Sequence, residues 1–281
     1  MRLRRTLVAA LCALAAFFAL AAGASAKTWV GLGDSFAAGP LIPNQSLSPL
    51  GCLRSSNNFA HKAAAQLGYT LVDVSCSGAK SDHMLNSQST DAGTNPPQFN
   101  ALTATTDTVS LQIGGNDIGF SEILQNCVTF NPFDGCKDEY VVNGVDLISQ
   151  RIANTAPKIA AAIQGIHTRS PIARVFVVNY AAILPDTGSL GCWPQVPLAF
   201  NDVPYLRSKQ KELNTMLATQ SAANGATLVN DYTASIGHDA CKSSSVRWVE
   251  PLVPTNAAAP FHPNLNGMTG IAGVVAATVG N

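Results

Sequence analysis

The sequence predicts an α/β fold, a three-layer α/β/α sandwich around a central parallel sheet of about five strands. Short apolar runs rich in β-branched residues alternate with longer segments of helical periodicity, as in chains that build parallel sheets. Only 12% of the 281 residues are charged and 47% are hydrophobic, which suits strands buried on both faces. No internal repeat or linker divides the chain, so we expect a single domain.

The expected elements follow one another in alternating order along the chain. The first expected helix begins at Asn58, directly after the capping candidate Asn57. The expected strands are Thr28–Leu32, Tyr69–Val74, Thr108–Ile113, Arg174–Asn179 and Thr227–Val229. The expected helices are Asn58–Leu67, Val145–Ile166, Pro204–Ala223 and Leu265–Val279.

The first 26 residues have the pattern of an export signal. Three arginines stand among the first five residues, residues 7–22 carry no charge, and Ala24-Ser25-Ala26 offers small residues before Lys27. We expect a signal peptide over 1–26, leaving a secreted, monomeric domain over 27–281 without a membrane anchor. An uncleaved anchor is the alternative, because the uncharged run from Thr6 to Ala26 is just long enough to span a bilayer.

The charge balance argues against nucleic acid as a partner. The 17 Lys and Arg residues match 17 Asp and Glu residues and form no cluster of the kind that binds phosphates. Because the predicted signal peptide holds three arginines and no acid, the domain that remains is slightly acidic.

Six cysteines remain after the predicted cleavage, which removes Cys12. An even number in an exported chain indicates three disulfides, but six cysteines allow 15 pairings and the sequence does not choose among them. No C-x-x-C pair or His/Cys cluster at ligand spacing occurs, so we expect no metal and no cofactor. The six are Cys52, Cys76, Cys127, Cys136, Cys192 and Cys241.

Three of the expected strands end in unusual polar and glycine-rich sequences, at the edge of a parallel sheet where chemistry is usually located. Gly33-Asp34-Ser35 follows the first strand, Ser77-Gly78 the second, and Gly114 to Asp117 the third. Taken singly, Ser35 could be an ordinary helix cap and Asn116 a turn residue. The G-x-S-x-G elbow of α/β-hydrolases does not occur.

Together with His262-Pro263-Asn264 near the C-terminus, these blocks resemble the SGNH, or GDSL, hydrolase family. They occur in the family's order, and the resemblance extends from Thr28 to the end of the chain. It is strongest to the secreted bacterial esterase and lipase branch, which has three disulfides. The resemblance implies the flavodoxin-like SGNH hydrolase fold and the pairs Cys52–Cys76, Cys127–Cys136 and Cys192–Cys241.

The resemblance also implies roles for individual residues. Ser35 would be the nucleophile that forms an acyl-enzyme, and His262 would be its general base. The N–H groups of Ser35 and Gly78 and the side-chain amide of Asn116 would form the oxyanion hole. For the other four histidines we expect structural or surface positions: His61, His83, His167 and His238.

One position departs from the common family pattern. Most members place an aspartate three residues before the histidine, and this chain has Ala259 there. Glu250 or Asp239 could orient the imidazole instead, or a backbone carbonyl near Ala259 or Pro260 could accept its N–H. We favour the carbonyl, because the branch that the chain resembles includes such Ser–His dyads.

We therefore predict a secreted serine esterase or lipase acting on carboxylic esters, with lipid acyl esters as the expected substrates. A phospholipase A, an esterase that deacylates carbohydrate or plant polymer, and a non-catalytic exported binding protein are the alternatives. The segments Ala37–Leu53 and Leu184–Pro204 are either an apolar acyl channel or ordinary surface loops. Chain-length preference, regioselectivity and the presence of a lid stay open at this point.

Overall fold

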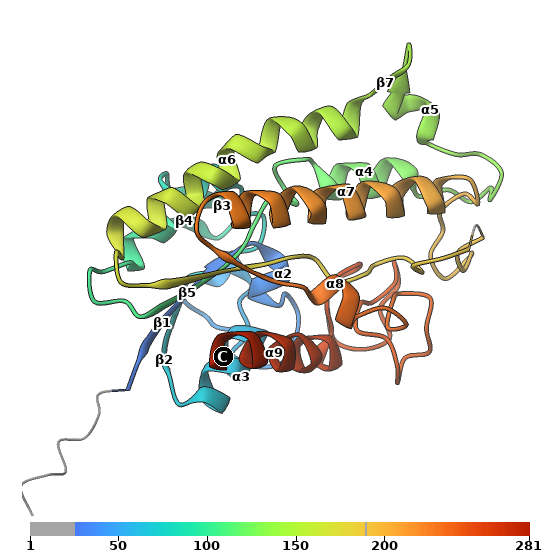
Figure 1. The fold of residues 1–281 in the computed structure, drawn as a ribbon. Helices are drawn as coiled ribbons and strands as arrows, with labels where there is room; N and C mark the ends of the chain where they lie inside the picture. Colours follow the sequence, from blue (N-terminus) through green and yellow to red (C-terminus); the bar gives the residue numbers. More distant parts are fainter. Residues whose placement is uncertain (1–25, 189) are drawn as a thin grey trace, which may run out of the picture.

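A computed structural model describes residues 26–188 and 190–281. The predicted signal peptide, apart from its last residue, lies outside the described residues. The centre is a parallel sheet with the strand order β2-β1-β5-β8-β9, which confirms the predicted α/β architecture (Figure 1). Its strands are β1 (Thr28–Gly33), β2 (Thr70–Asp73), β5 (Thr108–Gln112), β8 (Arg174–Val178) and β9 (Thr227–Val229).

Helices cover both faces of this sheet (Figure 1). The helices α3 (Phe59–Leu67) and α9 (Leu265–Gly280) pack against one another on one face, and α6 (Leu147–Arg169) and α7 (Asp202–Ala223) do so on the other. The shorter helix α4 (Phe120–Cys127) lies on the same side of the sheet as α6 and α7 (Figure 1). Within the described residues, we find no helix with the length and hydropathy that a membrane crossing requires.

Several short elements complete the described part of the chain. The helices are α2 (Ser35–Ala38), α5 (Lys137–Tyr140) and α8 (Asp231–Ala234), and the 3₁₀ turns are η1 (Leu50–Cys52), η2 (Ser81–Met84) and η3 (Gln98–Ala101). Two small antiparallel hairpins pair β3 (Gln88–Thr90) with β4 (Gly93–Asn95) and β6 (Val141–Val142) with β7 (Val145–Asp146).

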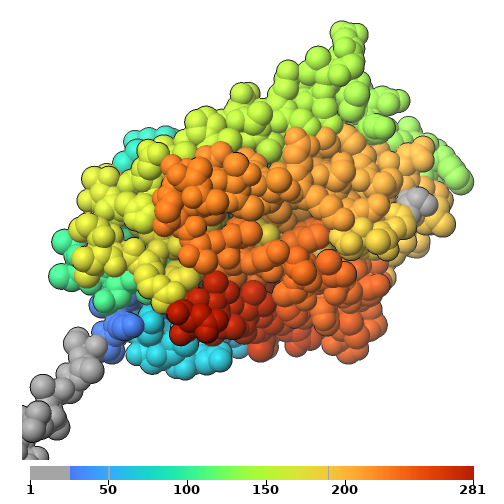
Figure 2. Space-filling view, viewed as in Figure 1, coloured from blue at the N-terminus to red at the C-terminus, as the bar shows by residue number. Residues whose placement is uncertain are grey.

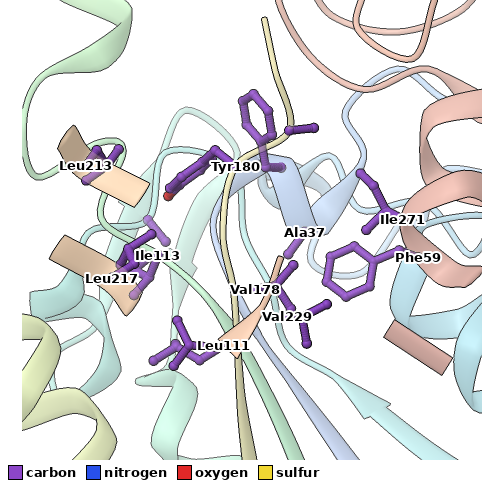
Figure 3. Packing of buried hydrophobic residues seen from close by; sticks show 14 of the residues in the cluster. Ala37, Phe59, Leu111, Ile113, Val178, Tyr180, Leu213, Leu217, Val229 and Ile271 are labelled. Carbon is purple, nitrogen blue, oxygen red and sulfur yellow. The ribbon is translucent and has the colours of Figure 1, made fainter. Parts of the chain in front are cut away.

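The central strands are apolar because each is covered from both sides. On one face of the sheet, Leu111 and Ile113 point towards Leu213 and Leu217 of α7 (Figure 3). On the other face, the side chains that meet belong to β8, β9, α2, α3 and α9: Val178, Val229, Ala37, Phe59 and Ile271 (Figure 3). Alternation along a strand therefore distributes apolar side chains to two separate cores rather than to core and solvent.

The predicted second strand is shorter and more exposed than expected. It spans Thr70–Asp73, and its side chains alternate between exposed and half-buried positions. The reason is that β2 is an edge strand, with a neighbour only on the β1 side.

Helix boundaries also correct the sequence predictions. Asn58, not Asn57, caps α3, because its Oδ1 accepts a hydrogen bond from the His61 N–H at 3.1 Å. The helix expected from Val145 begins at Leu147, where Asp146 accepts from the N–H groups of Ile148 and Ser149, both at 3.0 Å. Residues 145–146 belong to β7 instead.

Three disulfides fix the loops at the carboxyl edge of the sheet, and they are the pairs that the family resemblance implies. Cys52–Cys76 brings the η1 turn to the loop that follows β2. Cys127–Cys136 closes the loop that follows α4, and Cys192–Cys241 ties the loop before α7 to the loop after α8.

Candidate active site

Ser35 lies in a tight turn between β1 and the short helix α2. Asp34 caps this helix, since its Oδ1 accepts from the Phe36 N–H at 2.9 Å. A Cβ on Gly33 would lie 2.6 Å from the Gln112 carbonyl oxygen and 2.7 Å from the Ala37 Cβ, so only glycine fits at this turn. Ser35 therefore stands at the carboxyl edge of the sheet with its N–H at a helix start.

The structure brings His262 to Ser35 across a separation of 227 residues. His262 Nε2 lies 2.8 Å from Ser35 Oγ, and His262 Nδ1 lies 2.8 Å from the Pro260 carbonyl oxygen. A carbonyl can only accept, so Nδ1 carries the imidazole proton and Nε2 is left to accept from the serine hydroxyl. Phe261 between them has a positive φ of 58°, a tight turn that lets the ring reach back to the carbonyl.

The two acids considered as alternatives to the carbonyl form no hydrogen bond to His262. The Glu250 carboxylate accepts from Arg247 Nε at 3.1 Å and from Asn264 Nδ2 at 2.6 Å. The Asp239 carboxylate accepts from the Cys241 N–H at 3.0 Å. Both carboxylates therefore hold neighbouring loops, and the described partner of Nδ1 is the Pro260 carbonyl.

The surroundings of His262 favour its neutral form. Burial lowers the pKa of the His262 imidazole, and the hydrogen bond to the Pro260 carbonyl opposes this only in part. The ring also lies against Phe36, with 5.1 Å between the ring centroids. At neutral pH the imidazole is therefore unprotonated at Nε2 and able to accept a proton.

Hydrogen bonds tie the loop after β2 to the loop after β5. Asn116 Nδ2 donates to the Ala79 carbonyl at 2.9 Å, and its second N–H donates to no acceptor among the described residues. Asp117 accepts from the Ser81 N–H at 2.9 Å. Gly78 has a φ of +78°, and within the described residues the N–H groups of Gly78 and Ser35 donate no hydrogen bond. Of the residues that carry these N–H groups, Ser35 and Asn116 line one pocket with His262.

A buried brace behind Ser35 was not predicted from the sequence. Tyr180 follows β8, and its hydroxyl donates to Asp34 Oδ2 at 2.5 Å and accepts from the Gly115 N–H at 2.8 Å. Burial raises the pKa of Asp34 to about 7, although the hydrogen bonds from Tyr180 and Phe36 oppose this shift. The brace joins the ends of three neighbouring strands.

A second unpredicted contact fixes the end of β1. The amide of Gln98 accepts from the Gly33 N–H at 2.8 Å and donates to the Gly33 carbonyl at 2.9 Å. Neither Gln98 nor Tyr180 belongs to a recognisable motif. The available signal was weak: Tyr180 directly follows a predicted strand, as the three recognised blocks do.

A pocket with about 770 Å³ of empty space, its mouth included, opens beside the serine. Ser35, Asn116 and His262 line it, and Gly78 is not among its lining residues. Of the two segments considered as an acyl channel, Ala37–Leu53 contributes nothing to it and Leu184–Pro204 only Leu184. Its apolar wall comes mainly from α4 and α7, with Phe120, Ile123, Leu124, Leu206 and Leu213.

One charged side chain interrupts this apolar wall. Lys209 lines the pocket, and its ammonium is bound by Asp146 at 2.7 Å, Ser149 at 2.7 Å and Glu212 at 2.8 Å. These three partners satisfy the three N–H donors of the ammonium. The charge of Lys209 is therefore neutralised by its carboxylate partners.

The remaining histidines occupy structural positions within the described residues, as expected. Each contacts a neighbouring loop or helix and none lines the pocket. His61 Nε2 lies 3.6 Å from Asp73, His83 Nδ1 accepts from the Lys80 N–H, His167 contacts the Asn224 carbonyl, and the His238 ring stacks on Trp248.

Residues 32–269 match the GDSL-like lipase/acylhydrolase family. Lipase 2 of Streptomyces coelicolor is 38% identical over 245 residues, which cover 85% of this chain and 81% of that lipase.

Two solved structures have the same fold. Phospholipase A1 from Streptomyces albidoflavus aligns with a TM-score of 0.75 at 22% identity, covering 91% of this chain and 99% of that one. The extracellular lipase of Streptomyces rimosus aligns with a TM-score of 0.68 at 25% identity, covering 90% and 99%. The chain therefore belongs to the GDSL-like lipase/acylhydrolase family and is a carboxylic ester hydrolase.

Proposed function

We propose that the protein is a secreted serine lipase or esterase that cleaves acyl esters of lipids through a Ser35–His262 dyad. The observation that carries this proposal is the 2.8 Å contact between Ser35 Oγ and His262 Nε2 at the mouth of an apolar pocket. A serine hydroxyl is a poor nucleophile without a base within hydrogen-bond reach, and this contact supplies one. The same contact argues against a non-catalytic binding protein.

In the first half of the reaction, Ser35 Oγ attacks the ester carbonyl carbon while its proton passes to His262 Nε2. The carbonyl oxygen becomes an oxyanion. When the tetrahedral intermediate collapses, the bond to the alcohol oxygen breaks, and the alcohol leaves with the proton from Nε2. An acyl-enzyme ester on Ser35 remains. The Pro260 carbonyl holds the ring throughout by accepting from Nδ1–H.

In the second half, water attacks the acyl-enzyme and gives a proton to His262 Nε2. Collapse of the second intermediate releases the carboxylic acid and returns this proton to Ser35 Oγ. The N–H groups of Ser35 and Gly78 and the second side-chain N–H of Asn116 stabilise the oxyanion in both steps. Removal of one such donor typically costs about 3 kcal/mol of barrier.

The lining of the pocket supports an acyl chain as the group bound there. Aliphatic and aromatic side chains of α4 and α7 face it, and its one lysine is paired with the carboxylates of Asp146 and Glu212. A sugar would leave its hydroxyl groups without hydrogen-bond partners against such a wall. The carbohydrate-deacylating alternative is therefore disfavoured, whereas lipid acyl esters fit.

We infer secretion from the N-terminal sequence, in which a charged start, an uncharged run and Ala24-Ser25-Ala26 precede Lys27. The three disulfides support it, because such bonds persist in oxidising compartments. The similar lipase of Streptomyces rimosus is described as extracellular. N-terminal sequencing of protein from the culture medium should begin at Lys27, and retention of residues 1–26 in the cell membrane would contradict secretion.

The catalytic proposal is tested with p-nitrophenyl esters of increasing acyl length. Ser35→Ala and His262→Ala should each lower kcat at least about a thousand-fold. Ser121→Ala is the matched control, because Ser121 lines the same pocket without contacting His262 and should keep wild-type turnover within a few-fold. Retained turnover in Ser35→Ala would refute the assignment of the nucleophile.

A further inference from the structure

Four large apolar side chains are exposed on the loops that follow α4 and precede α7. Phe130 and Phe133 are 94% and 81% exposed, Leu190 is 62% exposed and Trp193 is 36% exposed. We call these four residues the aromatic rim. A cluster of exposed apolar side chains of this size on two neighbouring loops is unusual and indicates a binding surface for an apolar partner.

The two loops that carry the rim are held against each other. The Thr129 N–H donates to the Pro197 carbonyl at 2.8 Å, and the Phe200 N–H donates to the Pro132 carbonyl at 2.9 Å. Phe133 packs edge-on against Phe200, with ring centroids 5.6 Å apart. Figure 2 shows the two segments side by side at the right-hand end of the molecule. The four residues therefore form one surface. The disulfides Cys127–Cys136 and Cys192–Cys241 each constrain one of the two loops that carry it.

The rim continues the two walls of the pocket. Leu124 of α4 lines the pocket, and Phe130 follows it by six residues. On the other side, Asp202 at the start of α7 accepts from the Cys136 N–H at 2.7 Å, and Leu206 one turn later lines the pocket. The two rim loops thus join directly onto α4 and α7, the helices that form the apolar wall of the pocket.

The chemistry of the rim restricts its partner. Residues 128–133 and 190–201 contain no Asp, Glu, Lys, Arg or His, and the groove that Phe133 and Leu190 line holds one lysine, Lys137, beside Asp138 and Asp202. Attraction to an anionic lipid surface needs clustered lysines or arginines, which these segments lack. Transfer of aromatic and aliphatic side chains from water into an uncharged ester phase is favourable without any charged group on the protein.

We propose that the aromatic rim binds the surface of a water-insoluble, uncharged ester, so that acyl chains pass from this surface into the pocket. This rests on the proposed function, since the bound phase is the substrate itself. Phe130 and Phe133 are the principal contacts because they are the most exposed members of the rim. The rim positions the enzyme at the substrate surface and takes no part in the chemistry at Ser35.

The test compares a soluble ester with an emulsified one in the double variant Phe130→Ser/Phe133→Ser. Hydrolysis of p-nitrophenyl butyrate below its solubility limit should stay within two-fold of wild type, roughly the spread of a neutral surface change. Hydrolysis of a trioctanoylglycerol emulsion, and the fraction of protein that sediments with the droplets, should fall about ten-fold or more, because two buried phenyl groups are lost from the contact.

Ile172→Ser is the matched control. Ile172 is 63% exposed and precedes β8, at the opposite edge of the sheet from the rim. This variant should behave as wild type with both substrates. Full activity and binding of the double variant on emulsion would overturn the proposal, and so would a dimer that forms through the rim and dissociates in the double variant. If wild type hydrolysed neither ester, the proposed function itself would have failed.

Discussion

The hydroxyl of Tyr180 is expected to contribute strongly to stability because both of its partners are buried. Asp34 is only 1% exposed, and the Gly115 N–H lies within the same packed turn. Tyr180→Phe removes one oxygen atom and leaves both groups without this partner. An unpaired buried polar group costs about 1–3 kcal/mol, so the free energy of unfolding should fall by about 3 kcal/mol.

The assay is urea unfolding followed by tryptophan fluorescence, with Tyr69→Phe as the matched control. The Tyr69 ring packs against Trp29 with centroids 6.0 Å apart, and its hydroxyl makes no hydrogen bond within the described residues. The control should therefore lose less than about 0.5 kcal/mol.

A double-mutant cycle separates the brace from general effects of the substitution. Asp34→Asn and Tyr180→Phe should be non-additive by about 1 kcal/mol or more, because their side chains share one hydrogen bond. Additive effects, or a loss in Tyr180→Phe no larger than in Tyr69→Phe, would refute the reasoning.

Three further outcomes follow from the structure. Folded Asp34 has a pKa of about 7 against 3.8 ordinarily, so it keeps a proton that the unfolded chain releases, and stability from this group falls as pH rises from about 4 to 7. The free energy of unfolding of wild type should fall by about 4 kcal/mol more across this pH range than that of Asp34→Asn. If the two proteins lost the same free energy of unfolding between pH 4 and 7, the prediction would be contradicted. Glu250→Gln should lower the free energy of unfolding by about 3 kcal/mol, since it breaks a buried pair with Arg247, yet keep turnover within a few-fold; a thousand-fold loss of turnover would make Glu250 the orienting acid. Leu213→Trp narrows the pocket and should reduce kcat/KM for octanoyl esters about ten-fold more than for acetyl esters, whereas equal losses would exclude this pocket as the acyl site.

The sheet and its main helices were predictable because their signals are local. Buried strands such as β1 and β8 appear as short, mostly apolar runs, and α9 begins and ends within one residue of its predicted range. The exact caps were not predictable, because Asn57 and Asn58 are chemically identical and only the packed geometry selects between them. The edge position of β2 likewise depends on strand order, which the strand's own sequence does not encode.

The serine and histidine blocks were found because they resemble a known family, and their order along the chain matches it. Tyr180 and Gln98 were missed for a physical reason. A buried tyrosine or glutamine looks like any core residue until its partners are known, and those partners, Asp34 and Gly33, lie 146 and 65 residues away. The acyl pocket was sought in proline-rich loops, but its wall is formed by α4 and α7, whose inward faces read as ordinary amphipathic helices.

The most direct test of the Ser35–His262 dyad is to identify the residue that a fluorophosphonate ester labels in the folded protein. The reagent mimics an ester carbonyl and traps an activated serine, so mass spectrometry of the digested protein should find the label on Ser35. The labelling rate should fall at least about a thousand-fold in His262→Ala and remain near wild type in Ser121→Ala. Absence of label on Ser35 in folded wild-type protein, or rapid labelling without His262, would contradict the proposed dyad.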